Sequence, residues 1–137
     1  MRRRHILIAA GLFLPQAARA TPGEVATLIA ALTGGVPPGV GRVKLDLPTL
    51  VENGNAVSMT VSVAHPDPVA SLHVFAEANP NPNVLNIRFG AAAGPPLVST
   101  RIRLATSQTV TAVARMQDGS FWQDSVELLV TLAACIE

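Results

Sequence analysis

The chain has 137 residues, which is enough for one domain with a modest core. Four of its ten Lys and Arg residues stand in the first twenty positions, and none of its nine Asp and Glu residues does, so the remainder carries six basic against nine acidic side chains. This balance leaves no basic patch that would indicate nucleic-acid binding. No segment after residue 20 is long and apolar enough to predict a membrane-spanning helix.

The first twenty residues have the pattern of an export signal. Three arginines at residues 2–4 precede an apolar stretch at residues 6–14, and Ala18-Arg19-Ala20 fits a cleavage signal. We therefore expect residues 1–20 to be a signal peptide that is removed after Ala20, which predicts a periplasmic protein. An uncleaved anchor is disfavoured because the apolar stretch is short. Arg3-Arg4-His5-Ile6-Leu7 also fits a twin-arginine pattern, so both Tat and Sec export are compatible with the sequence.

A short helix is predicted directly after the cleavage point. Thr21 can cap it, Pro22 suits the first helical position, and Glu24 completes a capping box. We expect the helix to end near residue 33, before two consecutive glycines. Residues 21–41 would thus hold this helix and a linker rich in Pro and Gly. The apolar face of the helix would consist of Val25, Leu28, Ile29 and Leu32.

From residue 42 onward the apolar residues recur with period two, which is typical of strands with one buried face. Turn-forming residues separate these runs, and Asp118-Gly119 is the clearest hairpin signal. Because no helix intervenes, we predict an all-β fold over residues 42–132, an immunoglobulin-like antiparallel β-sandwich. Its seven strands are predicted at residues 43–47, 57–63, 71–77, 85–90, 98–105, 108–117 and 121–132.

Cys135 is the single cysteine, and it follows the last predicted strand. We expect residues 133–137 to form a C-terminal arm beyond the sheet. One cysteine cannot form an internal disulfide, so Cys135 is packed and inert, paired between chains, or a free reactive thiol. Its place on the arm favours an accessible thiol. Glu137 and the terminal carboxylate disfavour the thiolate, so we expect its chemistry to take place within a partner's active site.

Other residues that could carry chemistry are sparse. His5 leaves with the leader, and His65 and His73 have no neighbours at metal-ligand spacing. No nucleophile motif, phosphate-binding loop or dinucleotide fingerprint is present. We therefore predict no catalytic, cofactor-binding or metal-binding residues. A redox or metal-handling role for His65, His73, Met59 or Met116 is the least favoured alternative.

Several segments together resemble one known family. They are Glu52-Asn53-Gly54-Asn55-Ala56-Val57, Val74-Phe75-Ala76-Glu77-Ala78-Asn79-Pro80, Ser99-Thr100-Arg101-Ile102-Arg103-Leu104, Ser107-Gln108-Thr109-Val110 and Asp118-Gly119-Ser120-Phe121-Trp122. On these segments the chain resembles SoxY, the sulfur-substrate carrier of the periplasmic thiosulfate-oxidising (Sox) system. The resemblance covers essentially the whole chain, including the leader and the cysteine near the C-terminus.

The resemblance implies a role for each part of the chain. It implies an immunoglobulin-like sandwich, in agreement with the strand count, paired with a SoxZ-like sandwich protein as a heterodimer or larger assembly. It also implies that Cys135 carries sulfur intermediates covalently, and that the arm enters the active sites of successive sulfur-oxidising enzymes in the periplasm. The chain would then be a carrier subunit rather than an enzyme, without a cofactor other than the sulfur adduct.

The arm departs from the family pattern. SoxY arms typically end Gly-Gly-Cys-Gly-Gly, whereas this chain ends Ala133-Ala134-Cys135-Ile136-Glu137 and is similar to a SoxY-related branch with that ending. Glycines make the arm narrow and free in its backbone, and Ala and the β-branched Ile136 reduce that freedom. A channel shaped for a glycine arm would clash with Ile136 and Glu137. We therefore expect client enzymes with a wider, basic entrance rather than the thiosulfate enzymes proper.

One alternative of a different class stays open. The sandwich could serve only as a non-catalytic interaction or structural module of a periplasmic complex, with Cys135 packed or joined in an interchain disulfide. The apolar content of 49 % permits a sheet face that binds a partner.

Overall fold

The computed structural model describes residues 21–64, 68–90 and 94–132, and these form a β-sandwich with one helix. Within these ranges the larger sheet has the strand order β1-β9-β8-β5-β6, with β3 also paired to β9, and the smaller sheet has the order β2-β4-β7. The elements are α1 (Pro22–Thr33), β1 (Gly39–Val40), β2 (Val43–Asp46), β3 (Leu50–Val51), β4 (Val57–Val63), β5 (Val69–Ala76), β6 (Asn83–Arg88), β7 (Leu97–Ile102), β8 (Gln108–Met116) and β9 (Phe121–Val130).

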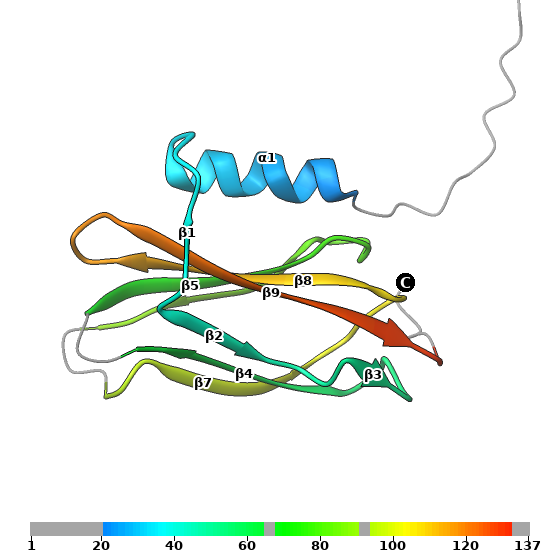
Figure 1. Cartoon of the computed structure of the whole chain (residues 1–137). Coiled ribbons are helices and arrows are strands. Elements are labelled where there is room, and N and C mark those ends of the chain that lie inside the picture. The colour runs from blue at the N-terminus through cyan, green and yellow to red at the C-terminus, as the bar shows by residue number, and fades with distance from the viewer. Residues whose placement is uncertain (1–20, 65–67, 91–93, 133–137) are drawn as a thin grey trace, which may run out of the picture.

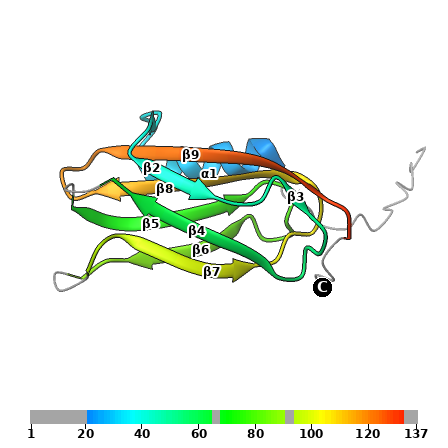
Figure 2. The same cartoon turned by 60° about the horizontal axis from the view of Figure 1, so that its bottom comes forward.

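The two sheets pack face to face, and α1 lies across the outer face of the larger sheet (Figure 1). Figure 2 shows β4 and β7 of the smaller sheet in front of the larger one. Most strand pairs are antiparallel, whereas β1 and β3 run parallel to β9. The predicted all-β antiparallel sandwich with a short N-terminal helix is confirmed.

Alternation of side chains builds the core between the sheets. In β4, Val57, Met59, Val61 and Val63 point inward and are buried, while the residues between them are exposed or half-buried. In β8 almost every residue is buried, because the smaller sheet covers one face of the larger sheet and α1 covers part of the other. Each fully buried Val or Leu side chain stabilises the fold by about 1.5–3 kcal/mol relative to an exposed one.

The helix begins and ends where the sequence predicts. The Thr21 hydroxyl accepts a hydrogen bond from the N–H of Glu24 at 3.3 Å, and Gly34 ends the helix with φ 70°. Val25 packs against Phe75 and Val113, with Ile29 and Leu32 beside them. Leu28, which was predicted on the same face, is 37 % exposed and does not belong to this cluster.

Two strands were missed. β1 lies in the segment predicted as a linker, and β3 follows β2 after a short break. Each has only two residues, which is too short to show a period, and each is defined by pairing with the distant β9. Most predicted strand ends also differ by one to three residues, and the largest difference is at β7, which stops at Ile102 instead of residue 105. The predicted signal peptide, residues 1–20, and the predicted arm, residues 133–137, lie outside the described residues.

Within the described ranges, no helix is long and apolar enough to cross a membrane.

Candidate functional site

The predicted attachment residue, Cys135, and its neighbours Ala133, Ala134, Ile136 and Glu137 lie outside the described residues. The structure therefore describes the candidate site only at the residues that precede the predicted arm. We call this place the arm base. It consists of the end of β9 and the segments that bind it: residues 49–54, Ser107 and residues 129–132.

Backbone hydrogen bonds hold the chain at the arm base as far as Leu132. The Leu132 carbonyl accepts from the N–H of Gly54 at 2.8 Å, and the N–H of Thr131 donates to the Val51 carbonyl at 2.9 Å. The N–H of Leu129 donates to the Thr49 carbonyl at 2.9 Å. The last described residue is thus fixed to a loop almost eighty residues earlier in the sequence.

Side chains add to this attachment. The Ser107 hydroxyl accepts from the N–H of Val130 at 2.8 Å. The Thr131 hydroxyl donates to the carbonyls of Val51 and Glu52, at 3.3 and 3.2 Å. Backbone groups at the end of a strand, which ordinarily bond to water, are here bound within the protein.

A buried polar network around Asn79 is joined by a backbone hydrogen bond to the loop of the arm base. The Asn79 side chain donates to the Arg103 carbonyl at 2.8 Å and accepts from the N–H of Ala105 at 2.9 Å and from the Gln108 amide at 3.0 Å. Asn79 and Gln108 are only 6 and 5 % exposed. One residue further, the N–H of Leu104 donates to the Gly54 carbonyl at 2.8 Å, which connects the network to the loop that binds Leu132.

This network brings several of the segments that carry the family resemblance into contact in the folded chain. The Glu77 carboxylate accepts from the N–H of Thr109 at 3.1 Å, and the Gln108 side chain accepts from the N–H of Ala78 at 2.9 Å. Three segments that are distant in sequence, around Gly54, Asn79 and Gln108, therefore meet beneath the end of β9. From the sequence these residues could be read only as turn signals and family motifs, because their contacts are made in the tertiary structure.

Among the residues considered for metal or redox chemistry, His73 is hydrogen-bonded to neighbouring strand residues, and both methionines are buried in the core. His73 on β5 has its Nε2 2.9 Å from the Ser71 hydroxyl and its Nδ1 2.7 Å from the Asn86 side-chain oxygen. Met59 and Met116 are buried in the core, 1 and 2 % exposed. His65 lies outside the described residues. No group of three or more His, Cys, Asp or Glu side chains that could hold a metal ion occurs among the residues that the structure describes.

The β8–β9 hairpin stands at the end of the sandwich opposite the arm base. The Ser120 hydroxyl and N–H both donate to the Asp118 carboxylate, at 2.6 and 2.8 Å. These bonds, the Ser120 hydroxyl first, hold the pKa of Asp118 below its ordinary value of 3.8, and the Arg42 charge lowers the pKa further. The Arg42 guanidinium lies 4.4 Å from the centre of the Trp122 ring.

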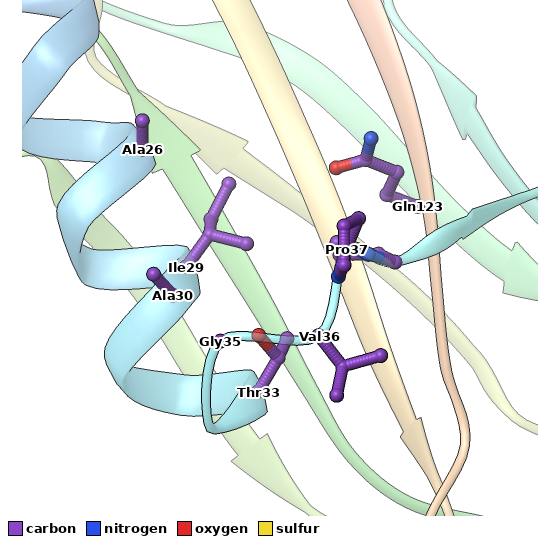
Figure 3. A pocket seen from close by; sticks show the side chains of 9 residues that line it. Ala26, Ile29, Ala30, Thr33, Gly35, Val36, Pro37 and Gln123 are labelled. Atoms are coloured by element: carbon purple, nitrogen blue, oxygen red, sulfur yellow. The ribbon is translucent and has the colours of Figure 1, made fainter.

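A groove of about 280 Å³ separates the end of α1 from the linker that follows it (Figure 3). Ile29 points into it, and the Thr33 hydroxyl, which is buried, has no hydrogen-bond partner in the described part of the chain. Because the described lining residues include no ionisable side chain, the groove offers shape and one hydroxyl rather than a catalytic group. The residues that line it are Ala26, Ile29, Ala30, Thr33, Gly35, Val36, Pro37, Pro38 and Gln123.

Solved structures of other proteins share this fold, and one of them is also similar in sequence. The sulfur carrier protein SoxY from Chlorobium limicola f thiosulfatophilum is 26 % identical, with a TM-score of 0.69, and the match covers 82 % of this chain and all of that one. Superoxide reductase (neelaredoxin) from Ignicoccus hospitalis is 15 % identical, with a TM-score of 0.57 over 81 % of this chain and 94 % of its own. A putative superoxide reductase from Thermotoga maritima is 21 % identical, with a TM-score of 0.56 over 69 and 87 %. These two reductases share the fold alone.

Comparison with family models also identifies a related family. No curated protein sequence matches the chain. The model of the sulfur oxidation protein SoxY matches residues 29–135, a range that contains the arm base and extends to Cys135. On this match, which covers well over half of its length, the chain belongs to the SoxY family of sulfur oxidation proteins.

Proposed function

We propose that this chain is a periplasmic carrier that holds sulfur intermediates covalently on Cys135 during sulfur oxidation of the thiosulfate type. It does so in complex with a SoxZ-like partner, and the sulfur-oxidising enzymes act on the cargo. Two comparisons support the proposal: the family match that extends to Cys135, and the similarity to a SoxY that is itself described as a sulfur carrier protein.

The observation that carries the proposal is the fixed origin of the arm. The chain is hydrogen-bonded within the protein as far as Leu132, and Cys135 follows three residues later. Three residues span at most about 10 Å when fully extended. A thiol on such a tether has a defined starting point and a short reach, which suits a group that is presented to other proteins.

The chemistry divides between the carrier and its clients. If thiosulfate is the cargo, a bond forms between Cys135 Sγ and the outer sulfur of thiosulfate, and one proton and two electrons are released. In this proposal the chain provides the thiol, and the enzyme that loads it provides the two-electron acceptor and the base that takes the proton. The chain is then a substrate-carrying subunit and not a catalyst on its own.

Intact-mass analysis of the full-length protein tests the proposal. The protein is purified without reductant from its own host during growth on thiosulfate, and a parallel strain carries Cys135→Ser. We expect sulfur adducts in the parent protein and none in the variant. An unmodified Cys135 thiol that resists alkylation in the folded protein would contradict the carrier role. An interchain disulfide on non-reducing electrophoresis, with partner activity retained in Cys135→Ser, would favour the interaction-module alternative.

The ending of the arm makes a separate statement about the client enzymes. We propose that Ile136 and Glu137 direct the arm to entrances wider than those of the thiosulfate enzymes proper. A reconstituted thiosulfate-oxidising Sox system with this chain as the sole carrier is expected to turn over poorly, and Ile136→Gly with Glu137→Gly to turn over faster. Full activity of the unmodified chain would refute this specificity and leave the carrier role intact.

A further inference from the structure

We propose that Leu50, Leu129 and Leu132 form a docking surface for the apolar rim of the entrance through which a sulfur-oxidising enzyme receives Cys135. We call these three residues the leucine surface. The inference rests on the proposed function, because it concerns where the proteins that act on Cys135 make contact.

The leucine surface is exposed and lies at the arm base. Leu50 on β3 and Leu129 on β9 are partners in the parallel ladder, and their neighbours Val51 and Leu128 are buried, so both leucines face away from the core. They are 60 and 62 % exposed. Leu132, whose carbonyl accepts the hydrogen bond from Gly54, is 59 % exposed. In both Figure 1 and Figure 2, β3 lies beside the end of β9.

The grouping distinguishes these leucines from other exposed apolar residues. Single exposed apolar side chains are normal, whereas a group of them indicates a contact surface. In the described part of the chain, three of the seven large exposed hydrophobic side chains gather at the arm base. The other four are dispersed: Leu28 on α1, Val36 and Val40 in the linker and β1, and Leu97 at the opposite end of β7.

The length of chain beyond Leu132 indicates what covers this surface. An enzyme that reacts with Cys135 Sγ must bring its own atoms to bonding distance of a thiol no more than about 10 Å along the chain from Leu132. A reaction centre set back by a few ångströms from the enzyme surface then places the rim of its entrance against the arm base. Every enzyme that admits the arm therefore covers the leucine surface, whichever sulfur compound it handles.

The surroundings add an electrostatic requirement. Glu127 is exposed two residues before Leu129 on the same strand, and Glu52 is exposed two residues after Leu50. Arg103, at the same end of the sandwich, lines a separate hollow with Asn79 and Val84. The complementary rim is thus apolar at its centre and basic at its margin. Three leucines make a small contact, as expected for a carrier that must leave one enzyme to reach the next.

The test uses a full-length double variant that carries both Leu50→Ser and Leu129→Ser. Its matched control is the single variant Leu97→Ser. Leu97 is 57 % exposed but lies on β7, at the end away from the arm base. Each chain replaces the parent in its host, cultures are fed thiosulfate or sulfide, and the fraction of Cys135 that bears a sulfur adduct is followed by intact mass. Iodoacetamide alkylation of the purified proteins measures the reactivity of the thiol itself, and thermal unfolding checks the fold.

We expect the double variant to gain adduct at least tenfold more slowly than the parent, with alkylation unchanged and Leu97→Ser like the parent. Equal adduct rates in the parent and the double variant would overturn the docking surface, as would an equal loss in Leu97→Ser. A change of oligomeric mass in the double variant alone would assign the surface to a subunit interface instead and overturn the proposal. No adduct in the parent under either feed would remove the carrier function and this inference together.

If the double variant unfolds, Leu129→Gln alone provides the same comparison with a smaller change. Its side chain is of similar length, and the position is 62 % exposed, so little buried area is lost. An adduct rate at least threefold below that of the parent supports the docking surface, and an unchanged rate overturns it.

Discussion

The two ends of the sandwich are held together in different ways. At the arm base and the network beneath it, hydrogen bonds join residues far apart in the sequence: Ser107 to Val130, Asn79 to Gln108, and Glu52 to Thr131, separated by 23, 29 and 79 positions. At the β8–β9 hairpin the side-chain bonds are local, since Asp118 and Ser120, and Ser120 and Trp122, are each two positions apart, while one backbone bond, from the N–H of Gln117 to the Pro68 carbonyl at 3.1 Å, reaches a distant segment.

The two kinds of bond have different effects: local bonds fix the shape of a turn, and long-range bonds fix the position of a segment in the fold. A bond between residues two apart fixes the form of a turn, but it does not determine where the turn lies in the molecule. Bonds across tens of residues fix a segment relative to the rest of the fold. The long-range bonds at the end of β9 therefore fix the chain relative to the fold as far as Leu132, the residue before the predicted arm.

Removing the polar network should have the largest effect. In Asn79→Ala, the Arg103 carbonyl and the Ala105 N–H lose a partner in a partly buried setting, and the buried Gln108 amide nitrogen keeps only its bond to the Thr106 carbonyl. We expect a loss of about 3 kcal/mol in the free energy of unfolding, measured by urea denaturation. The control is Asn53→Ala, whose bonds to Asn55 are local and exposed, and which should cost less than about 1 kcal/mol. Equal losses would mean that the network does not secure the arm base.

A steric change tests how the hairpin end is attached to the rest. A Cβ added at Gly39 would lie 2.7 Å from the Trp122 ring, closer than real Cβ atoms approach, so the ring or the strand β1 must shift. We expect Gly39→Ala to cost about 2 kcal/mol by the same measurement. The matched control is Gly23→Ala in α1, where the nearest atom is 3.7 Å away and helix propensity predicts a gain of about 0.5–1 kcal/mol. A neutral Gly39→Ala would show that β1 does not fix Trp122.

A single hydroxyl tests the strand end itself. Ser107→Ala removes the acceptor of the Val130 N–H, which we expect to cost about 1 kcal/mol. The loss should be local, so hydrogen exchange of the Val130 amide should become faster while that of Val113, in the middle of β8, keeps the rate expected from the global change. Uniform acceleration of both amides would argue against a separate bond at the arm base.

The smallest effect is expected at the hairpin and depends on pH. Since the pKa of Asp118 is lowered on folding, its ionised form adds stability that is present above pH 3.8 and is lost as the pH falls below that value through the folded pKa. The drop in Tm between pH 7 and pH 3 should therefore be slightly smaller in Asp118→Ala than in the parent. Ser120→Ala, which removes the main cause of the shift, should reduce the drop as well. A larger drop in either variant would contradict this assignment.

The long elements of the fold could be predicted from the sequence, whereas the two-residue strands could not. Period-two runs and the Asp118-Gly119 turn predicted β4, β8 and β9, and the Thr21 cap and Gly34 marked the ends of α1. β1 and β3 have two residues each and no period, so their pairing with β9 could be found only in three dimensions. In the same way, Asn79 before a proline indicates a turn, but its bonds to Arg103, Ala105 and Gln108 are tertiary. The assignments of Cys135 and its neighbours stay predictions.

The two-residue strands also bear on how the protein behaves in a crowded compartment. β9 is ten residues long, and a strand of that length at a sheet edge is a template for pairing with another molecule. β1 occupies the edge at Trp122 and Gln123, and β3 occupies it at Leu129 and Val130. Only the middle of the edge, residues 124–128, is left without a strand partner among the described residues, and there the Asp124 carboxylate already accepts from the N–H of Leu45. The short strands that hold both ends of β9 thus also shield this edge of the larger sheet from pairing with another molecule.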